Sequence, residues 1–178
     1  MKTIVEYLNE AKPKIRNKRL KGTFYHGSQI PEYEFFVPSL GYGDWDAIWV
    51  TTNESAAEHY SPWHHYSKDY SPIDVVFKIN IVANKIAELD NSTANQLLDY
   101  YEESDLREII PELQRLGFVG WETTGNIGRT AHDDIAIFDD RLLNVIAAKF
   151  RINGTWTEYI PIDECEEFVE SLKEEVPE

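Results

Sequence analysis

Cysteine and positive charge are both scarce in this chain. Cys165 is the single cysteine, which excludes an intrachain disulfide and a cysteine-based zinc cage and is consistent with a reducing compartment. Lysine and arginine number 17 against 32 acidic residues, for a formal net charge of −15. Loose, sequence-independent binding to nucleic acid or to an anionic membrane needs the opposite balance. This balance does not exclude a nucleic-acid substrate held in a small basic cleft.

Long apolar runs are also missing. No stretch is long enough to span a bilayer, and the charged N-terminus lacks the apolar core of a signal peptide. We therefore expect a soluble, cytoplasmic protein without a membrane partner. A chain of 178 residues with 42% hydrophobic residues suits one packed domain.

Apolar periodicity and turn residues predict short strands and a few helices without regular βαβ alternation, which favours an α+β fold. A basic connector is expected between the first helix and the first strand, at 14–21. The predicted strands are 22–26, 47–51, 73–82, 118–122, 134–138, 143–152 and 155–161. The first predicted helix covers 1–17, and the second runs from a Thr51–Glu54 capping box to about Tyr60. Two more helices are predicted within 92–116, separated near Pro111 and ended by Gly117. An acidic helix is predicted from about Asp163. Asn153-Gly154 predicts a tight hairpin turn.

Several motifs are incomplete. The loop Gly125–Gly128 has no Walker lysine, and no serine nucleophile elbow is present. His64 and His65 are adjacent, but no ligand set completes a metal site, so we expect no bound metal. The aromatic segment that contains them, 61–72, fits either a lid over a cleft or a plain surface loop.

Four separated features carry the chemistry, and they follow one another in a fixed order. They are Tyr25-His26-Gly27-Ser28, Ile48-Trp49-Val50-Thr51-Thr52, the helix turn Ala56–Tyr60, and Asp134-Ile135-Ala136-Ile137-Phe138-Asp139. Taken alone, each also fits a structural role: a strand-end turn, a core aromatic or a solvated strand entry. Their joint order favours a functional site.

In this order the features resemble the ADP-ribosyltransferase superfamily, in the His-Tyr-Glu branch of diphtheria toxin and the poly(ADP-ribose) polymerases. The segment Leu116-Gly117-Phe118-Val119-Gly120-Trp121 also resembles a Leu-Gly-Tyr-Asp-Gly stretch of bacterial and phage members. The resemblance covers about residues 20–150. It implies a split β-sandwich of two small antiparallel or mixed sheets flanked by helices, with NAD as the substrate.

The resemblance also implies a role for each residue. His26 would bond a ribose hydroxyl of NAD, and the backbone of Gly27 would pair with the nicotinamide amide. Trp49 and Tyr60 would stack on the cationic nicotinamide ring. Ser28, Thr51 and Ser55 are the further candidates for NAD contacts.

Asp134 would bond the 2′-hydroxyl of the nicotinamide ribose and stabilise the oxocarbenium-like transition state, so Asp134 and His26 are the expected catalytic residues. Two departures from the family pattern matter here. Trp49 replaces a tyrosine, and Asp134 replaces a glutamate that reaches about an ångström further, a scale on which misplacement costs ~10²-fold in rate. Asp133 is the alternative acid. Neighbouring strand residues face opposite sides, so only one of the two aspartates can point into the cleft.

The first residues carry a second, shorter resemblance. Met1–Ala11 is similar to the capsid-targeting leaders of T-even-like phage head proteins, and Leu8-Asn9-Glu10 fits their Leu-x-Glu cleavage site. The alternative is an ordinary amphipathic helix. We expect an N-terminal helix over 1–19 and a single ADP-ribosyltransferase-like domain over 20–178 that ends in an acidic helix. A phage origin would add packaging in the virion and action in the host cytoplasm.

These expectations leave three functional hypotheses. The first is a mono-ADP-ribosyltransferase or toxin-like effector that modifies a macromolecule, with protein favoured over nucleic acid as the acceptor. The second is an NAD glycohydrolase, in which water takes the acceptor's place. The third is a catalytically silent module that binds NAD, ADP-ribose or another partner. Acceptor and oligomeric state are not encoded in any motif.

Overall fold

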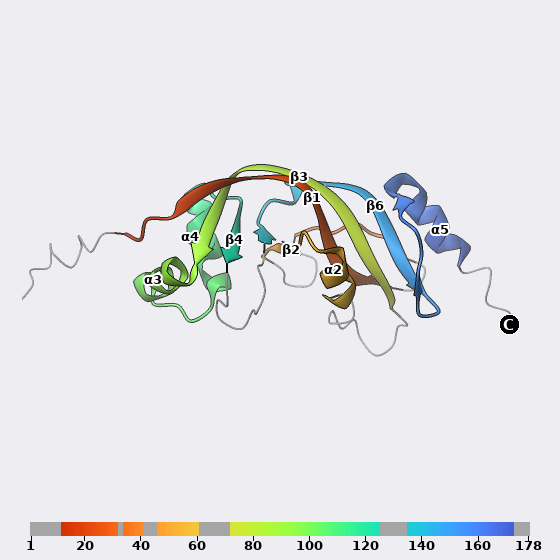
Figure 1. Ribbon diagram of the computed structural model, residues 1–178, viewed down its shortest axis with the longest axis horizontal. Coiled ribbons are helices and arrows are strands. Elements are labelled where there is room, and N and C mark those ends of the chain that lie inside the picture. Colours follow the sequence, from red (N-terminus) through yellow and green to blue (C-terminus); the bar gives the residue numbers. More distant parts are fainter. Residues whose placement is uncertain (1–11, 32–33, 41–45, 61–71, 125–134, 173–178) are drawn as a thin grey trace, which may run out of the picture.

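The computed structural model describes residues 12–31, 34–40, 46–60, 72–124 and 135–172, and within them it confirms a mixed α+β fold (Figure 1). The strands are β1 (Arg16–Ile30), β2 (Ile48–Val50), β3 (Ile73–Asp90), β4 (Gly120–Thr124), β5 (Ile135–Ile137), β6 (Leu143–Ile152), β7 (Thr155–Trp156) and β8 (Ile160–Pro161). The α-helices are α2 (Glu54–Tyr60), α3 (Asn91–Tyr101), α4 (Ile110–Arg115) and α5 (Cys165–Ser171). Short 3₁₀ turns are η2 (Leu106–Ile109), η3 (Asp140–Leu142) and η4 (Ile162–Glu164).

The strands form one hydrogen-bonded sheet rather than the two separate sheets that the sequence led us to expect. The order is β2-β5-β4-β3-β6-β7, with β1 also paired to β3 and β8 to β6. The physical reason is the length of β3, whose 18 residues pair with β6 along the first half and with β4 along the second. Figure 1 shows β1 and β3 arching over the molecule, with α3 and α4 at one end and α5 at the other.

An isolated bridge joins β2 back to β1. The amide of Tyr25 donates to the Thr51 carbonyl at 2.8 Å, and the amide of Thr51 donates to the Tyr25 carbonyl at 2.9 Å. Together with the pairs β1–β3, β3–β4, β4–β5 and β5–β2, this bridge closes a circuit of strands. The short strand β2 is therefore held between β1 on one side and β5 on the other.

Side-chain alternation along these strands sorts the apolar residues into two clusters, as the period of two requires. In β2, Ile48 and Val50 face a first cluster, which also contains Phe77 and Phe150. Trp49 faces the opposite side and packs on the second cluster, which lies beneath α3 and α4. The second cluster is built on the following buried residues: Ala87, Leu89, Ala94, Leu97, Ile109, Ile110, Leu113, Trp121, Ala136 and Phe138.

The N-terminal predictions are wrong where the structure tests them. Residues 12–15 are not helical and β1 begins at Arg16, so the predicted helix does not extend to residue 17, and no break separates 19 from 20. The basic connector 14–21 is largely strand, because Arg16 to Lys18 and Leu20 onward pair with β3. Residues 1–11, with the leader-like motif, lie outside the described residues.

Local helix signals were partly misassigned. The helix α2 is capped by Asn53, whose side chain accepts the Ala56 amide at 3.2 Å, rather than by a Thr51 capping box. The helical region after β3 breaks at Glu102, in the left-handed conformation at φ 58°, and not at Pro111. Pro111 instead occupies the first turn of α4, where its missing N–H has no helical partner to lose. Gly117 ends that helix at φ 81°, as predicted.

The C-terminal region follows the sequence more closely. Asn153 and Gly154 both have positive φ, 51° and 82°, which confirms the predicted hairpin turn between β6 and β7. The last helix is α5, reached through the 3₁₀ turn η4 near Asp163, although no side chain caps either one. Within the described residues, no helix has the length and apolarity to cross a membrane.

Gly120 explains part of the stretch that resembles the phage and bacterial family members. A Cβ at this position would lie 2.4 Å from the Ala136 carbonyl oxygen of β5. We expect Gly120→Ala to lower the free energy of unfolding by about 2–3 kcal/mol, because the neighbour is backbone and cannot rotate away. Urea unfolding measures the change, with exposed Ser92→Ala as a control. A loss below about 0.5 kcal/mol would contradict this close approach.

Candidate functional site

The predicted site residues come from three elements. His26, Gly27 and Ser28 lie near the end of β1, and Trp49 lies in the middle of β2, with Thr51 directly after that strand. Ser55 and Tyr60 lie at the two ends of α2. Asp133 and Asp134 lie outside the described residues, as do the aromatic segment 61–71 and the loop 125–132; in the sequence, Asp134 directly precedes β5.

The structure brings the first two motifs into direct contact. His26 Nδ1 lies 2.6 Å from the Trp49 carbonyl oxygen, a hydrogen bond that requires a proton on this nitrogen. The imidazole stacks on Phe77 with ring centroids 6.3 Å apart. Together with the Tyr25–Thr51 bridge, these contacts fix the ring of His26 beside β2.

The described part of the fourth motif lies beside the second. In the β2–β5 pair, Trp49 is opposite Ala136 and Val50 is opposite Ile135. The chain thus places the start of β5 next to the end of β2, on the side of β2 away from β1. Three motifs that are widely spaced in the sequence meet across three neighbouring strands.

The remaining predicted residues lie on β1, after β2 and on α2, each with its own local contacts. The Thr51 hydroxyl accepts the Asn53 amide at 3.0 Å and so shapes the entry into α2. Ser55 is exposed, and its carbonyl bonds His59 Nδ1 at 2.6 Å. Tyr60 is 38% exposed at the end of α2. The Ser28 hydroxyl reaches the Gln29 carbonyl at 3.5 Å.

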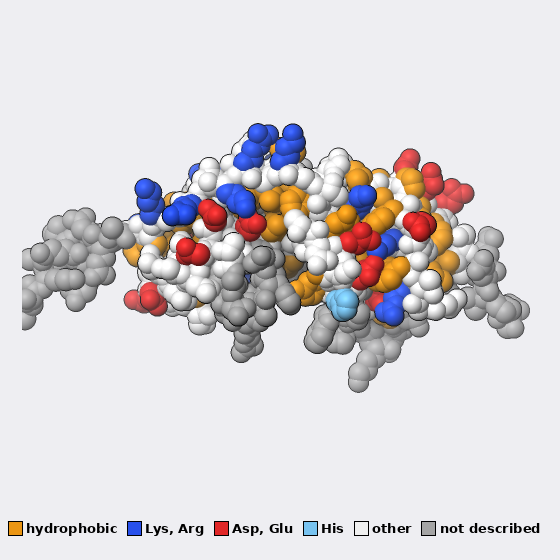
Figure 2. Space-filling view, viewed as in Figure 1, with side chains coloured by type: hydrophobic (Ala, Val, Ile, Leu, Met, Phe, Trp, Pro, Cys, Tyr) orange, Lys and Arg blue, Asp and Glu red, His pale blue; other side chains and the backbone are white. Residues whose placement is uncertain are grey.

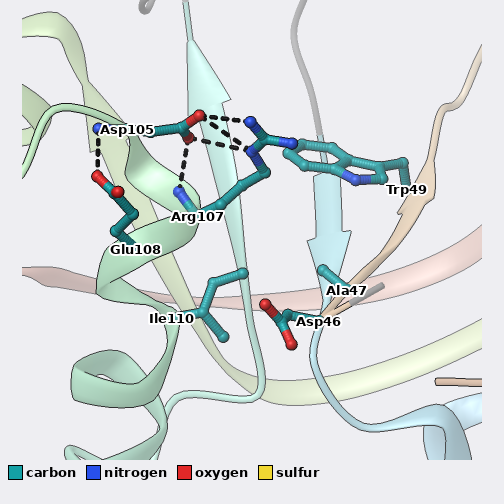
Figure 3. Close-up of a pocket in the computed structure, with 7 residues that line it drawn as sticks. All are labelled: Asp46, Ala47, Trp49, Asp105, Arg107, Glu108 and Ile110. Carbon is teal, nitrogen blue, oxygen red and sulfur yellow. Dashed lines mark hydrogen bonds and ion pairs between the residues drawn. The ribbon is translucent and has the colours of Figure 1, made fainter. Parts of the chain in front are cut away.

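Trp49 also lines a pocket that sequence reasoning missed (Figure 3). Its indole packs against Trp121, with ring centroids 5.7 Å apart and the planes at 63°. The pocket has a volume of about 260 Å³ and lies between β2 and the turn η2. Its lining comprises Asp46, Ala47, Trp49, Asp105, Arg107, Glu108 and Ile110. Only folding joins these two segments, so no local motif could reveal the pocket.

A buried ion-pair cluster anchors α2 to the sheet and was likewise missed. Lys149 of β6 is buried, and its ammonium group donates hydrogen bonds to the carboxylates of Glu54 and Glu58 on α2. The Lys149 Nζ also lies 5.3 Å from the ring centroids of both Trp156 and Tyr159. The four-residue spacing of the two glutamates, which places them on one helix face, was the available signal.

Electrostatics within this cluster favour the charged lysine. Burial alone lowers the pKa of Lys149, but the hydrogen bonds that its ammonium group donates to Glu54 and Glu58 outweigh this effect, so the pKa is raised. Burial raises the pKa of the neighbouring Tyr159 phenol, which therefore stays neutral. The cluster holds in place the helix that carries Ser55 and Tyr60.

The described residues contain no group of three or more His, Cys, Asp or Glu side chains arranged to hold a metal ion. His64 and His65 fall outside those residues. No protein-family model, no curated protein and no solved structure matches the chain. The chemistry of the site is therefore argued from its own residues: an oriented imidazole, an aromatic ring on the adjacent strand, and a strand that follows an aspartate.

Proposed function

We propose that this chain is a mono-ADP-ribosyltransferase that uses NAD as its substrate, on a form of the ADP-ribosyltransferase fold in which the strands are joined in one sheet. The observation that carries the proposal is the 2.6 Å contact between His26 Nδ1 and the Trp49 carbonyl, with β5 paired to the other side of β2. Motifs that resemble one family in sequence order are also neighbours in space. If the resemblance arose by chance from unrelated turns, there would be no reason for these motifs to lie next to one another in the fold.

The reaction assigns a task to each of these groups. The bond between C1′ of the ribose and the nicotinamide nitrogen breaks, and its electron pair leaves with neutral nicotinamide. A nucleophilic oxygen or nitrogen of the acceptor bonds to C1′ and gives its proton to a base. The carboxylate of Asp134 would stabilise the positive charge that develops on the ribose, and it could orient or deprotonate the acceptor.

The contacts of His26 support a binding role for its ring. Because Nδ1 is taken by the Trp49 carbonyl, the imidazole has one fixed orientation, with Nε2 at its other end. With the proton on Nδ1, Nε2 of the neutral ring is an acceptor, which suits the O–H group of a ribose hydroxyl. The indole of Trp49 lies on the other side of β2, against Trp121 and the pocket at η2, so the support from Trp49 comes from its carbonyl group rather than from its ring.

Two alternatives share the same NAD site. In an NAD glycohydrolase, water replaces the acceptor and free ADP-ribose is the product. In a catalytically silent module, NAD or ADP-ribose binds without nicotinamide release, and the two departures Trp49 and Asp134 favour this outcome. The transferase is preferred because Asp134 keeps the carboxylate that the reaction requires.

The test is nicotinamide release from NAD by the purified protein, alone and with cell lysate. Release with label from NAD on a macromolecule supports the transferase, whereas release with only free ADP-ribose supports the glycohydrolase. NAD binding without any release would leave the silent module.

We expect His26→Ala to lower the rate of release by ~10–10²-fold, because the variant removes a positioned polar group from the substrate site. His59→Ala is the matched control, since His59 bonds only the carbonyl of its own helix residue Ser55 among its described contacts. The ratio kcat/KM for NAD is compared, after thermal melting has shown that both variants fold. Equal rates for the two variants would remove His26 from the site.

A further inference from the structure

The pocket between β2 and η2 is a cavity with one aromatic wall, an apolar floor and a charged rim. Ala47 and Ile110 are only 3% and 2% exposed and form the floor, and Trp49 contributes its partly buried indole. Asp46, Arg107 and Glu108 are exposed at the rim. Figure 3 shows the Arg107 side chain extending from η2 toward β2, and Asp46 entering from the segment before β2.

The charges around the pocket do not cancel. The Arg107 guanidinium is paired with Asp105: its Nη2 lies 2.6 Å from Oδ2, and its Nε lies 3.2 and 3.1 Å from the two carboxylate oxygens. Three carboxylates and one guanidinium therefore leave two net negative charges, on Asp46 and Glu108. Glu108 uses Oε2 to accept the amides of Ser104 and Asp105 and the hydroxyl of Ser104, and its second carboxylate oxygen offers further acceptor sites.

These features together define the chemistry of a ligand. An aromatic wall and carboxylates attract a cation, and an apolar floor suits an aliphatic stem. Phosphate groups are disfavoured by the net charge of the rim. The whole chain, with a net charge of −15, would steer positively charged partners toward such a site.

We infer that this pocket binds the guanidinium or ammonium group of a basic segment in a protein acceptor. Its designation as an acceptor subsite rests on the proposed transferase activity, while the binding itself does not. Trp49 connects the two sites: its carbonyl holds His26, and its indole lines the pocket. An acceptor side chain anchored there would keep its segment next to the strand that carries the NAD site.

The distribution of basic residues argues against a nucleic acid as the partner of this pocket. Six of the 17 lysines and arginines fall within residues 12–21, on and before β1. In Figure 2, blue side chains gather along the upper edge of the molecule, above the position of β1. The pocket lies on different elements and has the opposite net charge.

The experiment uses the whole protein without NAD and a capped pentapeptide, Gly-Gly-Arg-Gly-Gly. Binding is followed by the shift of the Trp49 indole N–H resonance, assigned by comparison with Trp49→Phe. The same peptide with citrulline in place of arginine keeps the shape and removes the charge. We expect saturable shifts with arginine, weaker binding at high salt, and at least ~10-fold weaker binding of the citrulline peptide.

Three variants test the location. Asp46→Asn combined with Glu108→Gln should weaken binding at least ~10-fold, and the glutamine keeps an acceptor for the cap of η2. Glu166→Gln combined with Glu167→Gln on the exposed face of α5 removes the same charge elsewhere and should change binding less than about twofold. Arg107→Gln removes the positive charge beside the Asp105 carboxylate and should strengthen binding of the arginine peptide. In a phosphate-binding pocket the same substitution would weaken binding.

Several results would overturn the inference. They are equal binding of the arginine and citrulline peptides, equal loss in the two double variants, or binding of a single-stranded RNA oligonucleotide at the Trp49 resonance. Peptide binding without nicotinamide release would defeat the transferase proposal and leave the pocket standing. Release of nicotinamide without peptide binding would do the reverse.

Discussion

Replacing Asp134 with alanine is expected to lower the rate of nicotinamide release by ~10²–10³-fold, the scale seen when a group that stabilises transition-state charge is removed. Asp133→Ala is the matched control, because it removes an identical side chain one position away. If Asp134 is the catalytic acid, the two variants should differ strongly. The measurement is the rate of release at saturating NAD, with melting temperatures to show equal folding.

The chemical form of the substitution adds a second distinction. Asp134→Asn keeps the shape and removes the charge, so it should lose as much activity as alanine. Asp134→Glu keeps the charge and restores the side chain that the resemblance implies, so it should stay within about tenfold of the wild type or exceed it. If asparagine retains full activity, electrostatic stabilisation by Asp134 is wrong. If Asp133→Ala has the larger effect, the acid has been assigned one residue too late.

Features set by a few neighbouring residues could be predicted from the sequence. Asn153 and Gly154 form the predicted turn because a two-residue hairpin needs positive φ at both positions, whatever the rest of the chain does. Gly117 ends α4 for the same kind of reason. The alternating residues at the start of β3 gave a strand, since one face is buried in the first cluster.

Features set by pairing between distant segments could not be predicted in the same way. The run of basic residues at the start of β1 predicts a connector, yet Arg16 is opposite Glu88, and Lys18 forms an ion pair with Glu122. The charge pattern of β1 makes sense only next to the acids of β3 and β4. Pro111 was taken for a helix break, although it fits the first turn of a helix as well as it ends one.

The same distinction holds for the candidate site. The order of its motifs could be predicted from the sequence, and the contact of His26 with Trp49 places two of them together. The pocket at Trp49 could not be predicted, because Asp46 and Arg107 meet only after β2 has packed near η2. Lys149 was hidden for the same reason: a lysine in a strand indicates a solvent-facing position until its partners on α2 are known.

That lysine gives the prediction with the largest effect on stability. We expect Glu54→Gln combined with Glu58→Gln to lower the free energy of unfolding by about 2–4 kcal/mol, since a buried ammonium would lose both of its carboxylates. Lys149→Met should cost about 1–2 kcal/mol less, because the side chains of Glu54 and Glu58 are 39% and 27% exposed and can turn to water, while that of Lys149 is 7% exposed. The control is Glu112→Gln, in an exposed pair with Arg115, with an expected change below about 0.5 kcal/mol.

The pH dependence of this destabilisation has a definite sign. In the wild type the pKa of Lys149 is raised above its unfolded value, so its contribution to stability is present below the unfolded pKa and is lost as the pH rises through the folded one. Without the carboxylates, burial alone acts and lowers that pKa, so the double variant gains stability as the pH rises above it. Urea unfolding should therefore show a smaller difference in the free energy of unfolding between the wild type and the double variant at pH 9.5 than at pH 7.

The same double variant connects stability to the proposed activity. Because α2 carries Ser55 and Tyr60, a helix freed from Lys149 should bind NAD more weakly while the imidazole stays fixed by Trp49. The KM for NAD should then rise more than kcat falls, measured well below the melting temperature. A gap in stability that is equal at pH 7 and pH 9.5 would show that Lys149 is not a buried charge held by the two glutamates. A KM equal to that of Glu112→Gln would show that α2 holds no part of the NAD site.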